Sequence, residues 1–173
     1  MREIEPLSAL GIINVTSNLE FYQTIIFEYL DRDRYYYALT ENIEKLEEEL
    51  YRLKVSMQQI LNKEEVVIND KRVKPKVLGV DIGFKEEPEE PYLSYFIYFK
   101  GKLRRGEENY YENIYEELTV EYPFVAYWFF SPRFKILRVD ASGDIQILGN
   151  NIIIIKVQEG EKISGYERII FKG

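Results

Sequence analysis

The sequence has 173 residues, 46% of them hydrophobic, which is enough for one domain with a substantial core. It holds 23 Lys and Arg against 30 Asp and Glu, a formal net charge of −7, so a globally basic nucleic-acid binder is not expected. Cys and His are both absent, which excludes disulfides, thiol nucleophiles, Cys/His zinc sites and His-based catalytic triads. The side-chain chemistry that remains belongs to carboxylates, Tyr, Lys and hydroxyl groups.

The composition also bears on source and compartment. Enrichment in Lys and Glu, with two Met and no Cys, is typical of thermophilic proteins. No stretch approaches the roughly 20 apolar residues that cross a bilayer, and the charged N-terminus lacks the apolar run of a signal peptide. We therefore expect a cytoplasmic protein that does not interact with a membrane.

Residues 1–64 are predicted to form a helical pair. The first helix is expected to begin at Ser17, because Glu20 three residues later completes a capping box in which each side chain satisfies a free backbone donor. Apolar residues then recur at helical spacing over residues 17–30, namely Leu19, Tyr22, Ile25, Ile26, Tyr29 and Leu30.

The second predicted helix spans residues 34–61 and carries an unbroken heptad seam. Its apolar residues are separated by alternating steps of three and four: Tyr36, Leu39, Ile43, Leu46, Leu50, Leu53, Met57 and Ile60. This spacing indicates coiled-coil packing. We therefore predict a homodimer, with Leu46, Leu50, Leu53 and Met57 at the subunit contact. In the alternative, the chain's own sheet covers the seam and the protein is a monomer.

Residues 65–173 are predicted to form an antiparallel β-rich domain, either separate from residues 1–64 or in a single domain with them. A short hairpin is expected over residues 66–73, with its turn at Asn69-Asp70. A third helix is expected over residues 107–118, where one face would carry Tyr110, Tyr111, Ile114, Tyr115 and Leu118. Short turns separate the remaining strands, so a partly closed meander is expected over 77–84, 92–99, 124–130, 134–140, 145–148, 151–157 and 163–171. The predicted fold class is therefore α+β.

One segment matches a catalytic pattern. Residues 77–83 read Val-Leu-Gly-Val-Asp-Ile-Gly, which resembles the first strand of ribonuclease-H-like nucleases and actin-like ATPases. The resemblance implies that Asp81 binds a divalent metal, with Asp140 or Asp144 as further ligands. It covers seven residues only, and the hairpins further along the chain depart from that family. In the alternative interpretation, strand alternation simply points Asp81 to solvent.

Two basic clusters stand out in this acidic chain, and both lie at or beside predicted hairpin turns. Clamping of a nucleic-acid backbone is one interpretation; solubility and protection of sheet edges is the other. The candidate contacts are Lys71, Arg72, Lys74, Lys102, Arg104 and Arg105.

Three functional hypotheses follow from these features. The first is a non-enzymatic, self-associating interaction or scaffold module that needs no cofactor. The second is a nucleic-acid-binding accessory protein that uses the segments 71–76 and 100–105. The third is a Mg²⁺-dependent nuclease centred on Asp81.

Overall fold

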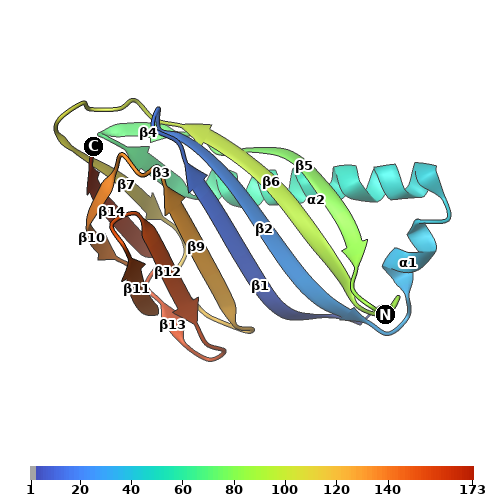
Figure 1. The fold of residues 1–173 in the computed structure, drawn as a ribbon. Coiled ribbons are helices and arrows are strands. Elements are labelled where there is room, and N and C mark those ends of the chain that lie inside the picture. The colour runs from blue at the N-terminus through green and yellow to red at the C-terminus, as the bar shows by residue number, and fades with distance from the viewer. Residues whose placement is uncertain (1–2) are drawn as a thin grey trace.

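The structure is a computed structural model that describes residues 3–173. It is mostly β, with 54% of residues in strands and 15% in helices (Figure 1). The predicted α+β fold with an N-terminal helical pair is therefore wrong. Within residues 3–173 no helix is long and apolar enough to cross a lipid bilayer.

The larger sheet has seven strands among the described residues. They are β1 (Ile4–Val15), β2 (Glu20–Asp31), β5 (Lys76–Phe84), β6 (Pro91–Lys100), β9 (Phe124–Phe130), β11 (Asp144–Leu148) and β12 (Ile152–Val157). Their order is β11-β12-β9-β1-β2-β6-β5, and β1 is antiparallel to β2 but parallel to β9. Strands from both sides of residue 64 thus pair within one sheet.

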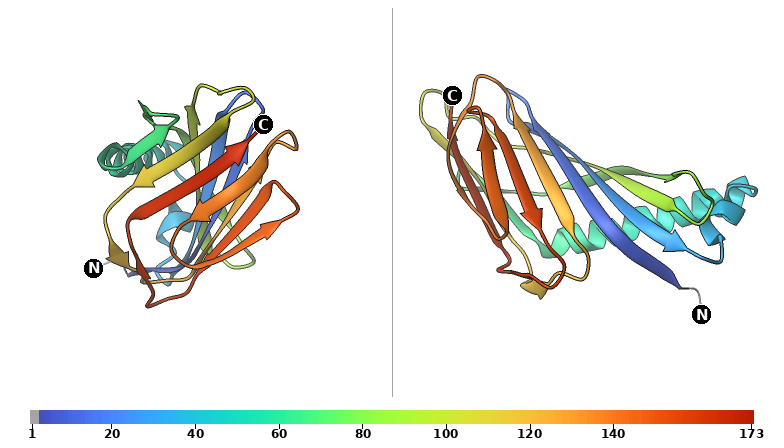
Figure 2. Two further views of the ribbon diagram at one scale, coloured as in Figure 1. Left: turned by 90° about the vertical axis from the view of Figure 1, so that its left-hand side faces the viewer. Right: turned by 60° about the horizontal axis from the view of Figure 1, so that its bottom comes forward.

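The second sheet has five strands among residues 3–173. They are β3 (Glu65–Ile68), β4 (Lys71–Val73), β7 (Glu108–Ile114), β10 (Lys135–Asp140) and β14 (Tyr166–Lys172), in the order β10-β14-β7-β3-β4. A small ladder joins β8 (Leu118–Thr119) to β13 (Lys162–Ile163). The five-stranded sheet covers one half of the larger sheet, and the long helix α2 (Ile43–Lys63) crosses the other half on the same side (Figures 1 and 2).

Aromatic side chains hold the two sheets together. Phe21 of β2 stacks on Phe99 of β6 and on Tyr111 of β7, at 4.6 and 5.8 Å between ring centroids. Tyr111 also packs against Trp128 of β9 at 4.9 Å. All four rings are buried, so the core lies between the inner face of the larger sheet and the elements that cover it.

The helix predicted over residues 17–30 is in fact strand β2. Glu20 does not cap a helix, because it lies in the strand and accepts a hydrogen bond from the Tyr98 hydroxyl at 2.9 Å. β2 lies between β1 and β6, and apolar residues occur on both of its faces. Aromatic and β-branched residues at consecutive positions satisfy a helical spacing as well as a strand spacing, and their β-propensity prevails here.

The helix predicted over residues 34–61 is two helices. The short α1 (Tyr35–Leu39) ends before Thr40, and α2 begins after Asn42, whose side-chain oxygen accepts a hydrogen bond from the Lys45 amide at 3.1 Å. The coiled-coil prediction is wrong, because α2 lies along β5 of its own chain. Part of the apolar seam contacts that fold: Leu53 and Met57 are buried, and Leu46 and Leu50 are half-buried. Ile43 and Ile60 at the two ends of α2 are exposed.

The helix predicted over residues 107–118 is also wrong, because residues 108–114 form strand β7. The hairpin over residues 66–73 is confirmed as β3 and β4, with positive φ at Asn69 and Asp70 as a tight hairpin turn requires. The other predicted strands are found close to their expected positions. They do not form one meander, because β10 pairs with β14 in the second sheet.

Candidate functional site

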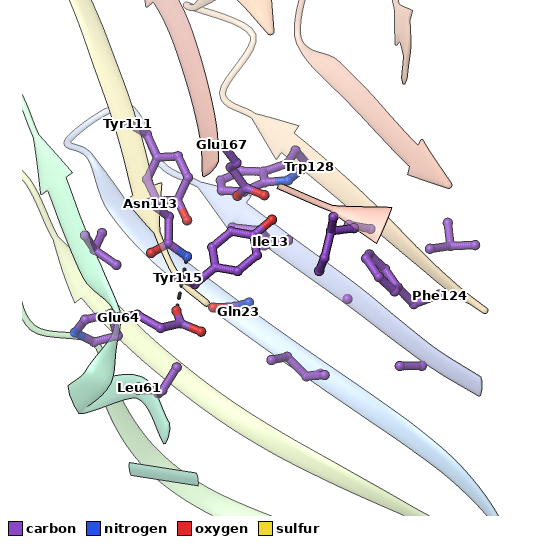
Figure 3. A pocket seen from close by; sticks show the side chains of 18 of the residues that line it. Ile13, Gln23, Leu61, Glu64, Tyr111, Asn113, Tyr115, Phe124, Trp128 and Glu167 are labelled. Atoms are coloured by element: carbon purple, nitrogen blue, oxygen red, sulfur yellow. Dashed lines mark hydrogen bonds between the residues drawn. The ribbon is translucent and has the colours of Figure 1, made fainter. Parts of the chain in front are cut away.

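A cavity of about 300 Å³ lies between the two sheets, beside the C-terminal end of α2 (Figure 3). Its floor is the inner face of the larger sheet, and β7 and β14 form the opposite wall. Apolar side chains dominate the lining, including Ile25, Phe27, Leu61, Phe124 and Trp128. A mostly apolar cavity with a few polar groups is the common form of a small-molecule site.

The cavity exists because three small residues lie side by side on its floor. Gly11 of β1 is paired with Ala126 of β9, and Ala9 is two residues further along β1. A Cβ atom placed on Gly11 would lie 3.9 Å from Ala126, so a side chain there would extend into open space. One step along the same strands, Ile13 pairs with Trp128, and these larger side chains fill the gap between the sheets.

A polar strip crosses the opposite wall. Strand pairing places Glu167 of β14 opposite Asn113 of β7. The Asn113 amide donates a hydrogen bond to the carboxylate of Glu64 at 3.1 Å, and the Tyr111 hydroxyl bonds to Glu167. In the close-up, Asn113 and Tyr115 appear between the two carboxyl groups (Figure 3). Strand alternation explains the strip, because positions 111, 113 and 115 all face inward.

The two carboxyl groups perturb the electrostatics of the cavity. Burial raises the pKa of Glu167 to about 7; the Tyr111 hydrogen bond opposes this increase and the nearby Glu64 adds to it. Burial also raises the pKa of Glu64, against the effect of the Asn113 hydrogen bond. The pKa of Tyr115 is raised to about 12, first by burial and then by the two carboxylates. A carboxyl with a pKa of about 7 exchanges its proton near neutral pH.

No basic side chain balances these acids. Among residues 3–173, no Lys or Arg lines the cavity. Its acidic groups are Glu64 and Glu167, and both carry negative charge when they ionise. Protonation of the carboxyl groups, or pairing with a cation that enters the cavity, therefore lowers the cost of burying them.

The sequence did not reveal this site. Glu64 lies beyond the helix predicted over residues 34–61, and in the helix predicted over residues 107–118 Asn113 would not share the face of Tyr111 and Tyr115. The only available signal was the alternation of residues 111, 113 and 115, which becomes visible once a strand is assumed. Glu167 lies more than 50 residues from Tyr111, so only the pairing of β7 with β14 brings the two together.

The two predicted basic segments lie next to each other. Asn69, in the turn between β3 and β4, donates a hydrogen bond to the Lys102 carbonyl at 2.9 Å, and Asp70 forms an ion pair with Arg104. The ion pair offsets one of the six candidate cations. Four of the others are exposed on β4 or in the nearby loops: Lys71, Arg72, Lys102 and Arg105. Lys74 is exposed too. Nucleic-acid binding through this region stays a prediction.

The structure does not bring the predicted metal ligands together. Asp81 is exposed on β5, an edge strand of the larger sheet, where it pairs with Ser94. Asp144 lies on β11 at the opposite edge of that sheet, and Asp140 belongs to the second sheet. Within residues 3–173, no group of three or more acidic residues is placed to hold a metal ion.

Comparisons with known proteins give little guidance. No family model matches the chain, and no curated protein matches it. One similar solved structure is described as "a putative protease from Parabacteroides distasonis ATCC 8503"; the sequence identity is 4% and the TM-score is 0.34. The match covers 99% of this chain but 40% of that protein, so this chain spans less than half of its length. At that TM-score the likeness carries no argument about function.

Proposed function

We propose that this protein is a non-enzymatic binding protein whose cavity takes a small organic cation, an amine or ammonium group attached to an apolar body. The observation that carries the proposal is the charge of the lining: two inward carboxyl groups, Glu64 and Glu167, and no Lys or Arg from the described part of the chain. The proposal keeps the non-enzymatic role expected from the sequence and moves its site from α2 to the cavity.

The carboxyl groups favour a cation over other ligands. Ionised carboxylates among apolar side chains are costly, as the raised pKa of Glu167 reflects. A cation that pairs with them removes this cost, whereas a neutral ligand does not and an anion adds repulsion. Charge-assisted hydrogen bonds between an ammonium and a carboxylate are also stronger than neutral hydrogen bonds.

The remaining lining suits the rest of such a ligand. Tyr111 and Trp128 lie 4.9 Å apart between ring centroids, and Tyr115 and Phe124 also line the cavity. Aromatic faces attract an ammonium group through cation–π interactions and accept an apolar body. A volume of about 300 Å³ is at the lower end of the range for ligand pockets, so the ligand is expected to be small.

Three isosteric probes test the charge preference: 2-phenylethylamine, 2-phenylethanol and phenylacetate, followed by calorimetry at pH 8. We expect the amine to bind, with at least tenfold weaker binding in Glu167→Gln and in Glu64→Gln. The matched control is Glu65→Gln, because Glu65 is exposed and next in the sequence to Glu64. Equal binding of the alcohol or the anion, or full binding in both cavity variants, would contradict the proposal.

A cavity-filling variant tests the place of binding without changing any charge. In Gly11→Leu, the new side chain extends between the sheets, and we expect amine binding to fall at least tenfold while the melting temperature holds or rises. Gly11→Ala is the graded control, since its single methyl group makes ordinary contacts and leaves most of the space. If Gly11→Leu is folded and binds as well as the wild type, the ligand lies elsewhere.

A further inference from the structure

A second cavity, of about 310 Å³, adjoins the first at the C-terminal end of α2. Leu61, Glu64 and Pro75 line both cavities, so the two spaces meet at these side chains. Leu61 and Glu64 of this shared wall are seen at the end of α2 in the close-up (Figure 3). Unlike the first cavity, the second is lined by cations, Arg72 and Lys74. The two cavities therefore present opposite charges on either side of one wall.

Hydrogen bonds fix the segment that carries these cations against α2. The Gln58 side chain donates a hydrogen bond to the Pro75 carbonyl at 3.0 Å and accepts one from the Val77 amide at 2.9 Å. Pro75 is buried between β4 and β5, and its ring restricts the backbone there. Lys74 directly precedes this anchored residue and Arg72 lies two residues earlier, so the backbone of both cations is held beside the second cavity.

The two cations are not neutralised by the protein. Within residues 3–173, neither Arg72 nor Lys74 takes part in an ion pair. Burial raises the pKa of Glu64, and the effect that opposes this rise is the Asn113 hydrogen bond, so the cations do not stabilise the ionised form of that carboxyl. Both positive charges are therefore available to an anionic group that enters the second cavity.

We infer that the ligand is a zwitterion whose carboxylate reaches the second cavity and binds Arg72 and Lys74. The inference rests on the proposed function, which places the ammonium group at Glu64 and Glu167. A guanidinium donates two parallel hydrogen bonds to a carboxylate. Asn62 adds a further donor, because its oxygen accepts a hydrogen bond from Gln58 and its NH₂ group faces no acceptor among the described residues.

The position of Glu64 defines the class of zwitterion. Glu64 belongs to the wall between the cavities, so the two charges of the ligand lie on either side of it. In an α-amino acid the charges are too close together for this, whereas an ω-amino acid separates them by an apolar chain. Because Arg72 and Lys74 are exposed, water screens the second contact, and we expect the carboxylate to strengthen binding by about fivefold only.

Calorimetry at pH 8 with 4-aminobutyrate, 6-aminohexanoate and 8-aminooctanoate, each beside its neutral carboxamide, tests the second contact. We expect at least one acid to bind about fivefold tighter than its amide, and this preference to disappear in the double variant Arg72→Gln/Lys74→Gln. Both side chains are exposed, so the melting temperature of the variant should match that of the wild type. The matched control is Lys71→Gln, because Lys71 is exposed on β4 but does not line the second cavity.

Binding of 2-phenylethylamine separates this inference from the proposed function. The amine has no carboxylate, so it should bind the double variant as well as the wild type. If the amine binds through Glu167 while every acid binds no better than its amide, the zwitterion is refuted and the proposed function stands. A preference for the acid that persists in the double variant also overturns the inference, because the carboxylate then lies elsewhere. If neither the amine nor the amino acids bind, both proposals fail.

Discussion

Replacement of Phe21 by Ala is expected to lower the free energy of unfolding by about 3–5 kcal/mol. Phe21 is fully buried, and its ring stacks on Phe99 of the same sheet and on Tyr111 of the other. Its removal therefore leaves a cavity at the contact between the sheets as well as a loss of apolar burial. Urea denaturation followed by fluorescence of Trp128 measures the change.

The matched control for this variant is Tyr51→Ala. Tyr51 is also aromatic but is 69% exposed on α2, so its loss should change the free energy of unfolding by about 0.5 kcal/mol or less. The comparison also separates the two assignments of residues 17–30. In the predicted helix Phe21 lies off the apolar face, so a small effect of Phe21→Ala would favour that helix over strand β2.

The sequence predicts local structure well where the pattern of residues is compatible with one type of secondary structure only. The region of α2 is long, rich in helix-forming residues and apolar on one side, and α2 occupies the later part of the single helix predicted over residues 34–61, whose beginning is the separate helix α1. The hairpin turn at Asn69-Asp70 was also predicted, since adjacent positive φ angles favour Asn and Asp. In both cases the local signal agrees with the tertiary structure.

The sequence was misleading where tertiary context decides. The heptad spacing of α2 indicates an apolar stripe, but it does not identify the partner; in the structure Leu53 and Met57 pack within the chain. The sequence analysis predicts no helix or strand over residues 4–15. In the structure these residues form strand β1, which pairs with both β2 and β9. The cavity depends on this strand, because Gly11 meets Ala126 only through the parallel pairing of β1 with β9.

The candidate site was out of reach for the same reason. Its two carboxyl groups come from the end of α2 and from β14, more than 100 residues apart in the sequence. Neither Glu64 nor Glu167 belongs to a recognisable motif, and a Glu in an acidic chain is ordinarily solvent-exposed. Only the closure of the second sheet over the larger one places both in an apolar cavity, where their burial perturbs their pKa values.

Replacement of Glu167 by Gln is expected to remove a pH-dependent loss of stability. The pKa of Glu167 rises from an ordinary 4.5 to about 7 on folding, chiefly through burial. Between these values the folded state binds more protons than the unfolded state, so the free energy of unfolding falls as pH rises from about 4.5 to about 7. At ~1.4 kcal/mol per pKa unit, Glu167→Gln should be more stable than the wild type by about 3 kcal/mol at pH 8, with little difference at pH 4.

The difference between two variants isolates this effect from other titrations. The pKa of Glu28 is lowered by its hydrogen bond to Lys85, so that pair contributes stability that is lost as pH falls, but it is present in wild type and variant alike. Glu65→Gln is again the control, and its stability should follow that of the wild type across the whole range. Parallel curves for the wild type and Glu167→Gln would show that burial does not perturb this carboxyl.

The same linkage predicts how a cation acts on the wild type. A bound amine pairs with the ionised form of Glu167, so binding opposes the protonation that burial favours. The affinity for 2-phenylethylamine should therefore increase from pH 5 to pH 8, and saturating amine should flatten the decline in stability over that interval. Calorimetry and thermal melting at the two pH values measure both effects. An affinity that is independent of pH would separate the ligand from Glu167, even if the variant itself shows the expected stability.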